Sequence, residues 1–179
     1  MECVKPKSVV ALVLLAVITG GLFMCCKSTC TNVKSVSDFD SEKFLGEWYE
    51  IARYDFRFEK NMSHVKAKYS MNENGTLRIE NSGFDYIAGK QKTRIGKAKF
   101  AGEKNEGKLK VSFFGPFYSG YNIIALDKNY SHALIAGDDL SLLWILSRTP
   151  EIPDDVKENY LNIARQIGYD VDKLVWTIQ

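Results

Sequence analysis

Apolar and polar side chains alternate in eight short segments between residues 47 and 148, and this pattern constrains the fold more than any other feature. A repeat of two is typical of strands with one buried and one wet face, whereas helices repeat about every 3.6 residues. Turns containing Gly, Asn, Asp and Pro separate the segments, which favours antiparallel neighbours. We predict strands near residues 47–55, 65–71, 77–80, 93–101, 107–114, 121–126, 132–136 and 142–148, with a turn over 115–120.

The strands are expected to close on themselves, because closure removes the unpaired edges of a sheet. The predicted fold is therefore all-β, an eight-stranded antiparallel up-and-down β-barrel. After the last strand, Pro150 ends the sheet, and apolar residues recur at helical spacing from Asp154 until Gly168 stops the run. A helix of this kind must lay its apolar stripe against the outside of the barrel. Residues 172–178 predict a ninth short strand beside the first.

The N-terminus has the layout of an export signal. Lys5 and Lys7 form a basic segment, and no residue is charged from there to Cys26. Fold reasoning excludes such a segment. We interpret residues 1–25 as a signal peptide or N-terminal membrane anchor, residues 26–40 as a polar tether, and residues 41–179 as the barrel domain with its C-terminal helix.

Three outcomes remain open for this leader. Cleavage before Cys25 or Cys26 would free a thiol for lipidation, so these two residues are the lipidation candidates. Retention would leave an uncleaved anchor, since an apolar run of about 18 residues approaches the length that spans a bilayer. Cleavage after Gly21 would release a soluble secreted protein.

Cysteine and charge limit the chemistry of the domain. All four cysteines lie at or before Cys30, which rules out a disulfide, a cysteine nucleophile and a cysteine-based zinc site further on. The net charge of +2 comes without any basic block, so a nucleic-acid partner is not expected. We expect no cofactor, no metal ion and no catalytic residue.

Three motifs stand in order along the chain: Gly46-Glu47-Trp48 at the first strand, Asp127 and Tyr130 between the sixth and seventh, and Arg148 after the eighth. With them the chain resembles the lipocalin family from about residue 38 onward. The resemblance implies that Arg148 packs on the Trp48 indole at a closed end of the barrel. Structural roles are therefore implied for Gly46, Trp48, Asp127, Tyr130 and Arg148.

The stretches Gly46–Arg53, Val111–Tyr118 and Trp144–Pro150 look closely similar to the bacterial branch of that family. This resemblance implies a location in the cell envelope, lipid-anchored in the outer membrane and facing the periplasm. A secreted or periplasmic soluble protein is the alternative. The same resemblance implies a carrier or storage protein for fatty acids, phospholipids or lysophospholipids, with a role in membrane maintenance or the response to stress.

Small side chains alternate with large ones on the inward faces, which favours a ligand cavity over a filled interior. We predict that the cavity is lined by Tyr69, Phe100, Val111, Phe113, Tyr118 and Trp144. Two other classes stay open, a lipid-converting enzyme that uses an inward Glu50 and an envelope interaction module with a filled barrel. A monomer and a homodimer are both compatible with the sequence.

Overall fold

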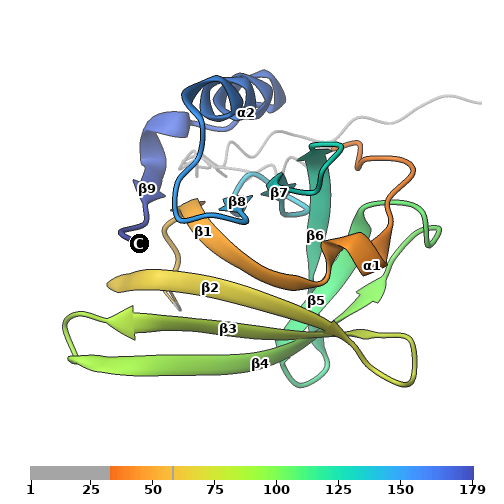
Figure 1. The fold of residues 1–179 in the computed structure, drawn as a ribbon, viewed down its shortest axis with the longest axis horizontal. Helices are drawn as coiled ribbons and strands as arrows, with labels where there is room; N and C mark the ends of the chain where they lie inside the picture. The colour runs from red at the N-terminus through yellow and green to blue at the C-terminus, as the bar shows by residue number, and fades with distance from the viewer. Residues whose placement is uncertain (1–32, 58) are drawn as a thin grey trace, which may run out of the picture.

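The computed structural model describes residues 33–57 and 59–179 and contains one sheet that closes into a barrel (Figure 1). The strand order is β2-β3-β4-β5-β6-β7-β8-β1-β9, and a further pairing of β2 with β1 completes the closure. The strands are β1 (Gly46–Tyr54), β2 (Met62–Met71), β3 (Leu77–Asp85), β4 (Lys90–Phe100), β5 (Lys108–Phe114), β6 (Phe117–Leu126), β7 (His132–Ala136), β8 (Leu143–Ser147) and β9 (Leu174–Trp176). The helices are α1 (Ser41–Phe44), α2 (Asp154–Ile167) and the 3-10 turn η1 (Val171–Lys173).

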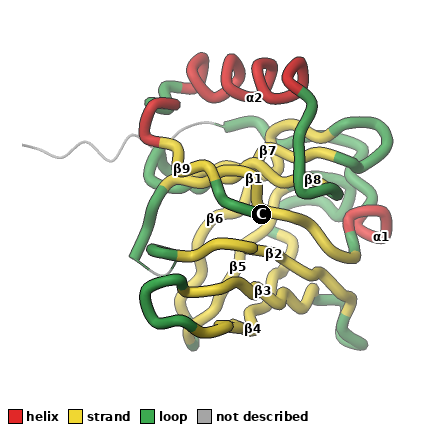
Figure 2. The backbone as a smooth tube through the Cα atoms, turned by 60° about the vertical axis from the view of Figure 1, so that its left-hand side comes forward, coloured by secondary structure: helices red, strands yellow, loops and turns green. Residues whose placement is uncertain are grey.

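The eight-stranded antiparallel barrel and the C-terminal helix are confirmed. In Figure 2, α2 lies along one outer side of the barrel beside β7 and β8. Its buried residues Tyr160, Leu161 and Ala164 pack with Leu134 and Leu143 in a second core between helix and sheet. The predicted ninth strand is also present, since β9 pairs antiparallel with the end of β1.

The inner core fills the inside of the barrel around Trp48, Leu77 and Ile123. β7 is buried over most of its length, because this core meets one face and α2 covers the other. β4, which has no helix over it, keeps the alternation of buried Gly96 and Ala98 with exposed neighbours. The helix thus explains why only part of the sheet shows a wet outer face.

The turn predicted over residues 115–120 is wrong. β6 begins at Phe117, which pairs with Phe114 of β5, and Ser119 pairs with Val111. Only Gly115 and Pro116 connect the strands, and Gly115 takes a positive φ of 56°. Pro116 stands outside the ladder, where its missing N–H costs nothing.

The structured domain begins before the predicted boundary at residue 41. The Val36 N–H donates to the Ile123 carbonyl at 2.9 Å, and the Val36 carbonyl accepts from Gly107 at 2.9 Å. Phe39 is buried in the inner core. Residues 36–39, which polar composition assigned to the tether, therefore form part of the barrel. Cys25 and Cys26 lie outside the described residues.

One end of the barrel is closed by α1 and by the predicted cation–aromatic pair. The Arg148 guanidinium carbon lies 3.8 Å from the centre of the Trp48 ring. Its nitrogens donate to the carbonyls of Lys43, Leu45 and Glu47 at 2.8–2.9 Å, so one side chain ties α1 to the start of β1. Such a stacked, forked contact requires a guanidinium.

The other signature residues support the same end. Gly46 has a φ of +94°, and a Cβ there would lie 3.3 Å from Arg148. The Tyr130 carbonyl accepts from Arg148 Nε at 3.1 Å. The Tyr130 hydroxyl accepts from the Asp40 N–H at 2.8 Å. Asp127 accepts from the Ser131 N–H at 2.6 Å and so fixes the β6–β7 turn. Each residue of the signature thus has a structural contact.

Neighbouring strands run antiparallel, so the β1–β2, β3–β4, β5–β6 and β7–β8 connections lie at the end opposite α1, which we call the open end. Figure 1 shows the first two of these connections on the side away from α1. No helix in the part of the chain that the structure describes is long and apolar enough to cross a membrane.

Candidate functional site

Two small hollows adjoin one another inside the barrel toward its open end. The deeper one has a volume of about 60 Å³ and the outer one about 70 Å³. Both are far smaller than a pocket for a drug-sized ligand, which spans roughly 300 Å³ or more, because core side chains fill most of the interior. The hollows share Phe56, Glu59, Val65, Asn81 and Phe113.

Four of the six predicted cavity residues line the deeper hollow. Tyr69 enters from β2, Val111 and Phe113 from β5, and Trp144 from β8. Their strands alternate as the sequence indicates, so these side chains face inward together. The wall is completed by Glu50, Ala67, Ile79, Tyr121 and Leu146.

Two predicted cavity residues lie elsewhere. Phe100 packs against the inner core but does not line either hollow. Tyr118 lies on the outer face, with the Lys99 ammonium 4.4 Å from its ring centre. The cause is the early start of β6: Ser119 pairs with the inward Val111, which turns Tyr118 outward.

The tyrosine of β6 that lines the deeper hollow is Tyr121, not the predicted Tyr118. Its hydroxyl lies 2.6 Å from the Tyr69 hydroxyl. Burial raises the pKa of both phenols, so they stay neutral and satisfy one another. Alternation along β6 was the signal that could have identified Tyr121, because it shares a face with the buried Ile123.

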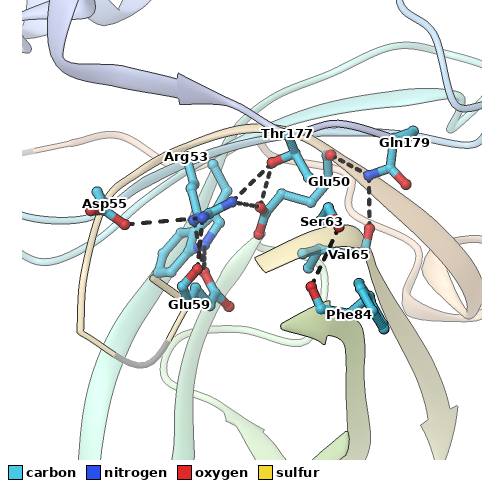
Figure 3. A network of polar contacts seen from close by, with 10 residues as sticks. Glu50, Arg53, Asp55, Glu59, Ser63, Val65, Phe84, Thr177 and Gln179 are labelled. Atoms are coloured by element: carbon cyan, nitrogen blue, oxygen red, sulfur yellow. Dashed lines mark hydrogen bonds and ion pairs between the residues drawn. The ribbon is translucent and has the colours of Figure 1, made fainter. Parts of the chain in front are cut away.

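A network of buried charges adjoins the deeper hollow, whose wall includes Glu50 and Glu59. Figure 3 shows the polar contacts of this network. Arg53 of β1 is only 2% exposed. It donates to Glu50 at 2.7 Å, to the Thr177 hydroxyl at 3.0 Å and to the Glu59 carbonyl at 2.7 Å. The Thr177 hydroxyl in turn donates to Glu50 at 2.7 Å. The network therefore joins β1, the β1–β2 connection and the C-terminus.

Glu59 brings a second carboxyl to this network. Its side chain accepts from the Trp144 indole N–H at 3.2 Å. Burial, and then the charge of Glu50, raise the pKa of Glu59 to about 8. Burial raises the pKa of Glu50 as well, although Arg53 opposes that shift. Since Glu50 has two donors at 2.7 Å, the proton of the pair resides on Glu59.

The network therefore holds one cation, Arg53, which is already paired with Glu50 at 2.7 Å and lies 4.0 Å from Asp55. No Lys or Arg lines the deeper hollow, so an anionic group placed there would lose hydration without compensation. Sequence reasoning identified Glu50 as inward-facing but could not identify Thr177 or Glu59 as its neighbours.

Positive charge appears instead at the mouth. Lys92 and Arg94 of β4 line the outer hollow with Ser82 of β3. Lys92 forms an ion pair with Asp85, and the Arg94 guanidinium lies 5.4 Å from the Phe114 ring centre. A ligand that fills the hollows with an apolar tail would bring its polar end to these groups.

Comparisons with known proteins match the chain over most of its length. Residues 39–179 match the model of the lipocalin-like domain. The outer membrane lipoprotein Blc of Escherichia coli K12 is 49% identical over 148 residues, which cover 83% of this chain and 84% of that protein. Blc of Vibrio cholerae is 38% identical and covers 94% of this chain and 96% of its own length. Insecticyanin from the tobacco hornworm Manduca sexta superposes with a TM-score of 0.68 at 23% identity, covering 84% of this chain and 86% of that one, which shows a shared fold.

Proposed function

Because the chain belongs to the lipocalin family, we propose that it is a lipid-binding carrier or storage protein of the cell envelope. Its ligand is a fatty acid, phospholipid or lysophospholipid whose acyl chain enters the barrel. The observation that carries this proposal is the pair of adjoining hollows, lined mainly by aromatic and aliphatic side chains and open between the loops at one end. The proposed role is maintenance of the membrane.

The proposed ligand enters tail first. The hollows are too small for a long acyl chain, so the rings of Phe56, Phe113 and Trp144 must move aside as the chain enters. Each methylene buried contributes about 0.8 kcal/mol, which offsets this rearrangement. The head group stays at the mouth near Lys92 and Arg94, because the inner cation is already paired.

Binding fits the site better than catalysis. Glu50 accepts from both Arg53 and Thr177, and Glu59 is held neutral by burial. A base needs a free anionic oxygen within reach of the substrate. Both carboxyls instead complete a network that joins three segments of the chain.

The expected test is a titration of residues 31–179 with lysophosphatidylcholine while tryptophan fluorescence is recorded. The strands and both cores lie within residues 33–179, so this portion contains the folding unit. Saturable quenching is expected with the lysolipid and none with glycerophosphocholine, which lacks the acyl chain. Trp144→Phe should remove most of the change, since Trp144 lines the deeper hollow.

Trp176→Phe is the matched control, because Trp176 is 42% exposed on β9 outside the barrel. It should leave the ligand response intact. A folded protein that shows no response to lysolipids or fatty acids would overturn the carrier proposal. It would shift the proposal to an interaction module with a filled barrel.

We also propose that the chain is anchored by a lipid on Cys25 or Cys26 and faces the periplasm from the outer membrane. The support is the export signal, together with the relatives named as outer membrane lipoproteins. Mass spectrometry of the full chain from a bacterial host should find an acylated N-terminal cysteine. Cys25→Ser and Cys26→Ser, made separately, should identify which thiol carries it. An unmodified mature protein in the soluble periplasmic fraction would contradict the anchor.

A further inference from the structure

Large apolar side chains are exposed at the tips of two hairpins beside the mouth. Phe117 is 79% exposed and Ile87 is 73% exposed, the two highest values among large apolar residues in residues 33–57 and 59–179. Ile87 lies in the β3–β4 turn, and Phe117 begins β6 after the β5–β6 turn. Tyr86 and Phe114 add exposed rings next to them. Both turns lie at the open end, where such side chains contribute little to the folded monomer.

Basic side chains surround these tips. The Arg94 guanidinium lies over the Phe114 ring, and Lys92 lies on the same face of β4 as Arg94, toward the outer hollow. The β1–β2 connection and the strand ends that flank the β3–β4 turn hold five basic residues (Arg57, Lys60, Lys90, Lys92 and Arg94) and three acidic ones (Asp55, Glu59 and Asp85). Because Glu59 is held neutral, this side of the mouth is more positive than the formal count suggests.

The remaining turn at the open end has the opposite character. The β7–β8 turn carries Asp138 and Asp139. Hydrogen bonds from Ser141 lower the pKa of Asp139, so this side stays anionic. The acidic turn packs against β6, where Asp138 accepts from the Asn122 amide at 3.4 Å, and the positive charge gathers around β4 and the β1–β2 connection.

We propose that the open end docks on a bilayer surface that contains anionic lipids, with Ile87 and Phe117 inserted among the head groups. Separate apolar tips with basic flanks suit an interface of lipids, where insertion and attraction to anionic head groups act together. The β3–β4 side of the mouth, where the basic residues gather, makes the main contact with the anionic head groups. This contact goes beyond the proposed ligand binding and does not depend on which ligand the barrel holds.

The absence of cysteine from residues 31–179 permits a direct test. Ile87→Cys is labelled with a polarity-sensitive dye and mixed with vesicles of phosphatidylcholine and phosphatidylglycerol. We expect a blue shift of dye emission, weaker with phosphatidylcholine alone and weakened by added salt, because the attraction is screened. Met71→Cys, labelled in the same way at the closed end, should show no shift.

Co-sedimentation with the same vesicles tests the tips themselves. The double variant Ile87→Ser and Phe117→Ser should weaken binding at least tenfold, since both inserted side chains are lost. Both residues are exposed, so the fold should persist, and an unchanged lysolipid titration confirms this. The double variant Lys60→Gln and Lys90→Gln should weaken binding to vesicles that contain phosphatidylglycerol but not to vesicles of phosphatidylcholine alone. Met71→Ser should bind like the parent.

Equal binding by the double variant and Met71→Ser would overturn the proposal. So would a dye at position 87 that stays in water while the protein sediments with vesicles. Failure of docking with normal lysolipid binding would leave the carrier function standing, whereas docking without lysolipid binding would contradict only that function.

Discussion

Glu59→Gln should make the protein more stable than the parent at alkaline pH and flatten the dependence of its stability on pH. Glu59 is buried beside Glu50, and its pKa is raised to about 8. A glutamine resembles the protonated acid: its carbonyl can accept from Trp144 and its amide can donate to Glu50. The substitution therefore preserves the neutral form that the fold requires.

Whether stability rises or falls with pH depends on which state, folded or unfolded, binds the proton of Glu59. In the unfolded chain Glu59 has its ordinary pKa of 4.5, whereas in the folded protein it keeps its proton up to about pH 8. Between these values the folded state binds more protons, so the free energy of unfolding falls as pH rises. Between pH 5 and pH 8, Glu59 lowers the free energy of unfolding by at most about 4 kcal/mol. This loss is smaller where Glu50 titrates with Glu59.

Urea unfolding of parent and variant at a series of pH values measures the effect. The difference between the two curves reports Glu59 together with Glu50, which is coupled to it, because the other groups titrate alike in both proteins. Glu103→Gln, in the exposed turn between β4 and β5, is the control and should follow the parent. Parallel curves for the parent and Glu59→Gln would contradict the neutral carboxyl.

The barrel was predictable because its determinants are local. Alternation places Val111, Phe113 and Trp144 on inward faces without knowledge of their partners. The helical stripe around Tyr160 likewise fixes which side of α2 must be covered. Each of these inferences needs only the spacing of residues within one element.

Register and distant contacts were not predictable in this way. The glycines around Tyr118 suggest a turn and place it at the cavity, but pairing with β5 extends β6 back through Gly120 to Phe117. Because side chains alternate along a strand, this register turns Tyr118 outward and Ser119 and Tyr121 inward. Thr177 reaches Glu50 from the far end of the chain through the pairing of β9 with β1. No spacing in the sequence encodes that contact.

The buried network also makes Arg53 the charged residue whose loss should cost most. Arg53→Met keeps an unbranched apolar side chain but removes the guanidinium group, which leaves Glu50 buried without a cation. Removing one partner of a buried pair destabilises by about 3–5 kcal/mol, because the remaining charge is uncompensated. A large fall in the urea midpoint is expected, with the loss growing at alkaline pH as Glu59 also ionises.

Arg78→Met is the matched control. Arg78 and Glu80 form a pair at the same distance, 2.7 Å, but their side chains are 39% and 36% exposed. Water screens such a pair, so its loss should cost less than about 1 kcal/mol. Equal effects of the two substitutions would show that burial is not what gives Arg53 its importance.

A compensated variant separates charge from shape. Arg53→Met combined with Glu50→Gln and Glu59→Gln removes the cation and both acids together. Since no buried charge then lacks a partner, this variant should regain most of the stability that Arg53→Met loses. Its stability should also lose the dependence on pH that Glu59 gives the parent. A triple variant as unstable as Arg53→Met would show instead that the hydrogen bonds of Arg53 to Thr177 and the Glu59 carbonyl, rather than its charge, hold the β1–β2 connection in place.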